Sequence, residues 1–194
     1  MGTTVNREAV RERMKQDGIE FILVQFVDIH GSVKVKQVPV HCFDDVVDDG
    51  AGFAGAAVWG VGQGPHSHDL MARADLDTYQ RLPWKPNVAL FSSNLFVDTE
   101  PHPYCPRVNL VRMLKLFEAE GYTLNCGFEP EHFLVTRTSD GGIKIWDPLG
   151  IDTLAKPCYD FKGMSQAMDY LQDIIRFGNR SEEHTSELQS RGLI

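Results

Sequence analysis

The sequence is short of the features that would place it in several large classes of protein. Basic residues number 19 against 27 acidic ones, and a net charge of −8 disfavours nucleic acid and anionic membranes as partners. No apolar run is long enough to cross a bilayer, and the N-terminus is polar where a signal peptide is hydrophobic, which predicts a cytoplasmic protein. The four cysteines stand singly along the chain, which favours buried reduced thiols over a zinc knuckle or a redox pair: Cys42, Cys105, Cys126 and Cys158.

Several common catalytic motifs are missing or out of context. The sequence contains no Gly-Lys-Ser/Thr phosphate loop and no Gly-x-Ser-x-Gly elbow. Residues 50–55 satisfy the Gly-x-Gly-x-x-Gly pattern, but the acidic segment 44–49 precedes them where a dinucleotide-binding fold has an apolar strand. A nicotinamide oxidoreductase is therefore a distant alternative, which a strand ending at Asp49 and a helix starting at Gly55 would revive.

What is present is an ordinary globular composition, with 42% apolar and 24% charged residues. Local signals predict a helix that begins after Asn6 and ends at Gly18, followed by a hairpin of strands 21–28 and 33–40. The six glycines of residues 50–64 exclude a regular helix there. A further strand is expected over residues 88–98, before a proline-rich cluster that we take as a domain boundary.

The second half of the chain shows clearer helical periods. Proline and glycine signals predict a helix from Pro106 to Gly121. Strands are expected over residues 122–137 and 143–146, on either side of a turn. The strongest helical period ends at Gly178 and consists of Met164, Ala167, Met168, Leu171, Ile174 and Ile175.

The last residues have a different character. The segment Arg180–Ser190 is polar and aperiodic, and it equals the translation of a widely used DNA-sequencing adapter. We therefore interpret residues 180–194 as a sequencing artefact rather than biological sequence, and the rest as a fragment of a longer protein.

Two glutamates in residues 129–131 are the most informative candidates for chemistry. On an extended segment Glu129 and Glu131 project to the same face, and apolar neighbours suggest that this face is buried. Two adjacent buried carboxylates need a proton, a basic partner or a cation, and oxygen ligands suit Mg²⁺ or Mn²⁺. Exposed strand carboxylates are the commoner explanation of such a pair, so both interpretations stay open.

A second candidate metal site is weaker. His66, His68 and Asp69 put two imidazoles and a carboxylate within four residues. Such runs are more often solvated loops, because two ligands from one short segment rarely make a site alone. A loop is therefore expected at residues 64–69.

Several short motifs occur in a fixed order along the chain. Residues 121–133 read GYTLNCGFEPEHF, and residues 26–31 read FVDIHG. Further landmarks follow at residues 52–55, 67–70, 75–76, 82–84 and 106–107. In order and spacing these motifs resemble the glutamine synthetase family, whose corresponding segment is Gly-Tyr-x-x-x-x-Gly-x-Glu-x-Glu-Phe-Phe. The resemblance covers about residues 18 to 179.

The resemblance implies an α+β protein with a β-grasp domain over residues 1–101 and the start of the catalytic domain over residues 102–179. It implies an ATP-dependent ligase that forms a γ-glutamyl amide through γ-glutamyl phosphate. It also implies a homo-oligomeric ring with active sites between subunits.

Metal roles follow from the same resemblance. Glu129 would serve the cation nearer the nucleotide and Glu131 the one nearer glutamate, so that Mg²⁺ or Mn²⁺ neutralises the phosphoryl oxygens. In this interpretation the remaining metal, ATP and glutamate ligands lie beyond residue 179, and the fragment is expected to be inactive.

One position departs from the ammonia-using members of the family. Residues 53–57 read FAGAA where those members read Phe-Asp-Gly-Ser-Ser, so Ala54 stands where an aspartate helps to bind ammonium in a neighbouring subunit's site. Ala54 and Ala57 are therefore expected to line an amine pocket with room for a methyl group. This wording resembles the branch that includes γ-glutamylmethylamide synthetase and bacterial type III-like enzymes. Ammonia and methylamine both stay open as substrates, and the rival class is a non-catalytic binding or regulatory module of the same fold.

Overall fold

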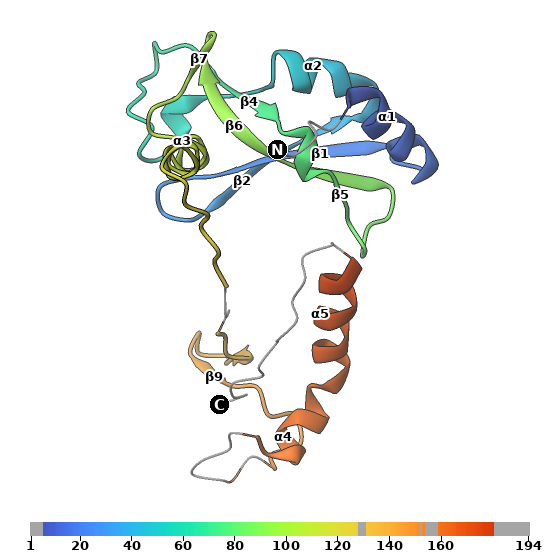
Figure 1. The fold of residues 1–194 in the computed structure, drawn as a ribbon. Coiled ribbons are helices and arrows are strands. Elements are labelled where there is room, and N and C mark those ends of the chain that lie inside the picture. Colours follow the sequence, from blue (N-terminus) through green and yellow to red (C-terminus); the bar gives the residue numbers. More distant parts are fainter. Residues whose placement is uncertain (1–5, 128–130, 152, 154–158, 181–194) are drawn as a thin grey trace. The chain divides into compact units, whose positions relative to one another are not determined.

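The computed structural model describes residues 6–127, 131–151, 153 and 159–180, in two compact units over residues 1–124 and 125–194 (Figure 1). The helices and strands of the first unit are α1 (Arg7–Gln16), β1 (Phe21–Val27), β2 (Val33–Pro39), η1 (Val40–Cys42), α2 (Phe43–Asp48), β3 (Ala51–Phe53), η2 (Gly55–Ala57), β4 (Leu70–Ala74), η3 (Leu76–Thr78), β5 (Gln80–Arg81), β6 (Val88–Val97), β7 (Glu100–Pro101) and α3 (Pro106–Ala119). Those of the second unit are β8 (Val135–Arg137), β9 (Ile143–Ile145), α4 (Phe161–Gln166) and α5 (Met168–Arg180). None of the described helices is both long and apolar enough to cross a membrane.

One mixed sheet organises the first unit. Its main strands lie in the order β2-β1-β6-β4-β3, and β5 and β7 pair with opposite ends of β6. The central pair β1 and β6 is parallel, whereas the other neighbours are antiparallel. With helices packed on this sheet, the expected α+β class is confirmed.

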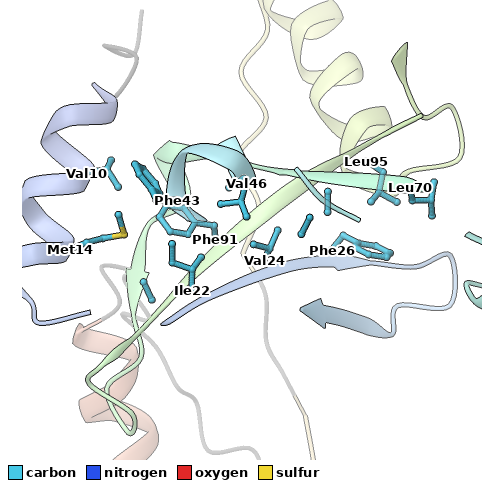
Figure 2. Close-up of a cluster of buried hydrophobic side chains, with 14 of the residues drawn as sticks. Val10, Met14, Ile22, Val24, Phe26, Phe43, Val46, Leu70, Phe91 and Leu95 are labelled. Atoms are coloured by element: carbon cyan, nitrogen blue, oxygen red, sulfur yellow. The ribbon is translucent and has the colours of Figure 1, made fainter. Parts of the chain in front are cut away.

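The core of the first unit lies between α1, α2 and the sheet, as Figure 2 shows. Every second residue of β1 points into it, and the rings of Phe43 and Phe91 stack at 6.1 Å between centroids. Burying a side chain of this size contributes about 1.5–3 kcal/mol, so this cluster is the main support of the sheet. Its labelled members are Val10, Met14, Ile22, Val24, Phe26, Phe43, Val46, Leu70, Phe91 and Leu95.

Local signals in the sequence place the first elements correctly. The side chain of Asn6 caps α1 by accepting the backbone N–H of Glu8 at 3.0 Å. Gly18 follows the helix with a φ of +67°, a conformation that glycine adopts without strain. The predicted hairpin is confirmed as β1 and β2, paired from Phe21 with Pro39 to Val27 with Val33.

The faces of β2 are the reverse of what polarity alone suggests. Lys34 pairs across the hairpin with the buried Phe26, and its Nζ lies 3.3 Å from the carboxylate of Asp28. Val33 and Val35 point to the other face and are 58% and 50% exposed. The strand therefore turns Lys34 toward the buried Asp28 and leaves an apolar face open.

The predicted strand over residues 122–137 is mostly wrong. Only Val135–Arg137 form a strand, whereas residues 122–127 and 131–134 lie outside any helix or strand. A strand needs a neighbouring backbone for its hydrogen bonds. The three residues of β9 supply only three paired positions, and one further bond joins the N–H of Trp146 to the carbonyl of Leu134 at 2.9 Å.

The predicted C-terminal helix is interrupted. The helix is interrupted at the buried Ala167. Its N–H donates to the carbonyl of Met164, three residues back, instead of the carbonyl four residues back as in an α-helix. That tighter bond ends α4, and α5 starts at Met168. Gly178 does not end the helix, because α5 continues to Arg180.

Candidate functional site

The glycine-rich motif of residues 50–55 is part of the sheet rather than a dinucleotide loop. It follows α2, not a strand, and it opens the short strand β3 and then a single 3-10 turn, η2. Gly50 has a φ of +94°, and a Cβ there would lie 2.9 Å from the backbone of Ala72 on β4. The close approach of β3 to β4 therefore explains this glycine, and the context that would revive an oxidoreductase is not found in the described residues.

The predicted amine-pocket residues lie together in one turn. Ala54 caps η2, and its carbonyl accepts the N–H of Ala57 at 3.0 Å. The side chains of Ala54, Ala56 and Ala57 are exposed, whereas Gly55 is buried beneath them. We call residues 54–57 the alanine turn. It presents only methyl groups to whatever binds there.

The strand before the alanine turn is anchored to the hairpin. Lys36 on β2 donates from Nζ to the carbonyl of Gly52 at 2.8 Å and lies over the ring of Phe53 at 5.9 Å. The Phe53 ring meets the ring of Phe26 edge-on, with centroids 5.0 Å apart. These contacts fix where the turn begins.

Residues 64–69 form a loop, as predicted. His68 Nδ1 lies 2.8 Å from Oδ1 of Asp98, a residue that follows β6 and that sequence reasoning missed because it is 30 positions away. The hydrogen bond and the negative charge of Asp98 raise the pKa of His68. Asp98 itself has a φ of +54°, uncommon for a residue other than glycine. His68 thus fastens the loop to the sheet.

The predicted metal ligands are only partly visible. Glu129 lies outside the described residues, and Glu131 is exposed in an irregular segment. The expected burial is wrong for two of the described neighbours, because Phe133 and Val135 are 60% and 47% exposed, whereas Leu134 is partly buried. Next to Glu131, the Nε2 of His132 lies 2.9 Å from the hydroxyl of Tyr170 on α5.

Glu131 has the right chemistry for a hard cation but stands alone. Among the described residues, no group of three or more His, Cys, Asp or Glu side chains gathers in a way that could hold a metal ion. One exposed carboxylate fills one of the six or more oxygen positions that such an ion takes. The described residues therefore do not complete a metal site.

Asp28 is a structural residue that the sequence interpretation missed. Its carboxylate is buried in the β1–β2 turn and accepts the N–H groups of His30 and Ser32, both at 2.9 Å. Burial raises the pKa of Asp28, but these two hydrogen bonds and Lys34 outweigh it and hold the pKa below its usual value. An Asp three residues before a Gly in a turn is a signal that could have found it.

Two of the ordered landmarks meet in space. Arg107, in the first turn of α3, forms an ion pair with Asp75, whose side chain also caps η3 through the N–H of Asp77. Both partners are about a quarter exposed, and the pair joins α3 to the sheet. This contact has a structural role in the first unit.

Two family models together match most of the chain. A model described as "Glutamine synthetase, beta-Grasp domain" matches residues 18–98, and one described as "Glutamine synthetase, catalytic domain" matches residues 103–189. A glutamate–methylamine ligase of Methyloversatilis universalis is 44% identical over 160 residues, which are 82% of this chain and 36% of the relative. A glutamine synthetase of Rhizobium meliloti is 34% identical over 163 residues, 84% of this chain and 36% of the relative.

Solved structures give the same result. A GmaS–ADP complex superposes with a TM-score of 0.74 at 28% identity, over 91% of this chain and 39% of the other. Apo GmaS superposes with a TM-score of 0.71 at 30% identity, over 85% of this chain and 38% of the other. The chain thus spans little more than a third of the length of the relatives that it matches.

Proposed function

The chain belongs to the glutamine synthetase family, and from this premise we propose that it is part of an ATP-dependent ligase that joins an amine to the γ-carboxylate of glutamate. The observation that carries the proposal is the match of both domain models in order, with a β-grasp unit followed by the start of a catalytic domain. The named relatives are ligases, which favours this function over a non-catalytic module.

The proposed reaction has two steps. An oxygen of the glutamate γ-carboxylate attacks the terminal phosphorus of ATP, and ADP leaves. The amine nitrogen then attacks the acyl carbon of γ-glutamyl phosphate, loses a proton, and phosphate leaves. Mg²⁺ or Mn²⁺ would neutralise charge on the phosphoryl oxygens, with Glu129 and Glu131 among the ligands.

We propose methylamine rather than ammonia as the preferred amine. The alanine turn offers exposed methyl groups and no side-chain carboxylate, so it lacks a negative charge to compensate the small, fully polar ammonium ion. A methyl group on the amine gains about 0.8 kcal/mol when it is buried against apolar surface. The higher identity to the glutamate–methylamine ligase, 44% against 34% to the glutamine synthetase, supports the same choice.

We further propose that the full-length protein is a homo-oligomer with active sites between subunits. An open apolar surface supports this. Trp59, two residues after the alanine turn, is 76% exposed, and its ring contacts the ring of His30. Ile29, next to His30, is 62% exposed and lies against Gly60. Val27, Val33 and Val35 on the hairpin extend the exposed apolar area. A second copy of the chain that covers this surface would enclose the amine pocket.

The test is an assay of the full-length enzyme. Phosphate release is measured with ATP, glutamate and either methylamine or ammonia, in Mg²⁺ and in Mn²⁺, and the amide product is identified by mass. We expect glutamate-dependent release and a higher kcat/KM for methylamine. Release without amide formation, or no release at all, would show that this family member is not a glutamate–amine ligase. A preference for ammonia would retain the ligase and refute the choice of amine.

A further inference from the structure

Gly55 and Gln63 are in unusually close contact beneath the alanine turn. A Cβ on Gly55 would lie 1.5 Å from Oε1 of Gln63, 2.5 Å from its Cδ and 3.1 Å from its Cβ. Apart from the chain neighbours Ala54 and Ala56, no residue has an atom nearer to that position. The Gln63 side chain therefore lies directly against the backbone of the turn, and only glycine leaves it room.

Gln63 also ties the turn to the rest of the unit. Its Nε2 donates to the carbonyl of His68 at 3.2 Å, and His68 is held by Asp98. The intervening loop is pinned at two further points, because a Cβ on Gly60 would meet Ile29 and one on Gly62 would meet Tyr104. Gln63 is thus the side chain around which the loop of residues 54–68 closes.

The other end of the Gln63 amide is unsatisfied. Oε1 is buried and has no hydrogen-bond partner in the described part of the chain. Buried polar atoms without a partner are rare and call for an explanation, since an apolar side chain of similar size would fill the same space without that cost. The Gln63 amide group lies against the backbone of Gly55, between Ala54 and Ala56.

We propose that Gln63 is a positioning residue for amine selection: its side chain fixes the alanine turn, and so sets how Ala54 and Ala57 meet the amine. The inference rests on the proposed ligase function and deepens it. Gln63 acts through the turn and does not itself touch the substrate. Glutamate, ATP and metal binding involve other parts of the enzyme and are independent of it.

The experiment uses the full-length enzyme with Gln63→Leu, which keeps the volume and removes the amide, and with Gln63→Ala, which removes both. We expect the KM for methylamine to rise about five- to tenfold in both, the scale of one lost hydrogen bond. The KM values for glutamate and ATP and kcat at saturating methylamine stay within about twofold, because only amine binding has changed.

A double-mutant cycle tests the contact itself. Gly55→Ala alone forces Gln63 aside and raises the KM for methylamine, whereas Gly55→Ala in the Gln63→Ala background adds little, since only the 3.1 Å contact remains. Gly64→Ala is the matched control in the same loop. A Cβ there meets nothing within 4 Å, so its KM is expected to equal that of wild type.

The outcomes separate the two proposals. If wild type ligates methylamine but Gln63→Leu and Gln63→Ala leave its KM unchanged, the positioning role is wrong and the ligase stands. If they raise the KM values of all substrates together, or lower the melting temperature without affecting amine binding, Gln63 is only structural and the inference fails. If wild type ligates no amine, the proposed function itself has failed.

Discussion

Replacing Gly50 by alanine tests whether the glycine-rich motif serves the sheet or a bound nucleotide. Gly50 lies between α2 and β3, and its N–H donates to the carbonyl of Asp45 at 2.8 Å, which ends the helix. Its φ of +94° excludes a side chain, and so does the backbone of Ala72, which would lie only 2.9 Å from an added Cβ. The substitution is therefore expected to disrupt the pairing of β3 with β4.

The expected cost has two parts. A left-handed backbone costs about 1–2 kcal/mol for a residue with a Cβ. The backbone carbon and oxygen of Ala72 cannot move aside as a flexible side chain would, and such overpacking costs about 1–3 kcal/mol. The free energy of unfolding should therefore fall by about 2–5 kcal/mol, which is large against the 5–15 kcal/mol of a typical domain.

The assay is denaturant unfolding of the full-length protein, with amide hydrogen exchange in β4 as a local probe. Gly64→Ala is the control, and it should stay within about 0.5 kcal/mol of wild type because its surroundings are open. If Gly50→Ala is as stable as Gly64→Ala, the close approach of β3 and β4 is not what requires the glycine. A different result would identify a nucleotide loop: the wild-type protein binds a nicotinamide nucleotide, and Gly50→Ala loses that binding while it keeps its stability.

Four further predictions follow from the proposed site. Glu129→Gln and Glu131→Gln each lower kcat of the full-length enzyme at least about a hundredfold, because they keep shape and remove charge, and wild-type rates in Mg²⁺ and Mn²⁺ would exclude a metal role. Ala54→Asp shifts the kcat/KM ratio of methylamine over ammonia toward ammonia by about fourfold or more, the value of one lost methyl contact, and an unmoved ratio would separate the turn from the amine. Asp98 raises the pKa of His68, so the His68–Asp98 ion pair stabilises the fold below about pH 6.5 and loses this effect as the pH rises through the raised pKa. His68→Gln therefore lowers the melting temperature more at about pH 5.5 than at about pH 8.5. An equal effect at both pH values would contradict the ion pair. The 194-residue chain alone releases no phosphate from ATP with either amine, and turnover by it would show that Glu129 and Glu131 suffice without further ligands.

Features encoded within a few residues could be predicted from the sequence. The cap at Asn6, the glycine after α1, the hairpin and the proline at the start of α3 each depend on neighbours in the chain, and the structure confirms all four. The alanine turn is also local, so the sequence could place Ala54 and Ala57 together.

Contacts between distant residues could not be predicted in the same way. His68 and Asp98 are 30 positions apart, and Asp75 and Arg107 are 32 apart, and no periodic pattern links either pair. The contact of Gln63 with Gly55 depends on how the whole loop closes, so nothing in the local sequence signals it. The reversed faces of β2 have the same origin, because Lys34 pairs with the buried carboxylate of Asp28 and Lys36 donates to the carbonyl of Gly52.

The apolar stripes of the two units explain which half of the proposed site is complete. The stripe of α1 is buried by the sheet of its own unit, whereas in the second unit Met164 on α4 and Ile175 on α5 are each 46% exposed. A helical period specifies burial in the whole protein, and the chain spans only 36% of the relatives that share its domains. The alanine turn lies between Phe53 and Val58, which pack against the buried core of the first unit, so the part that we propose to select the amine is supported by that core. Glu131 is exposed in an irregular segment, and the core cluster of the described residues has no member from the unit that contains it.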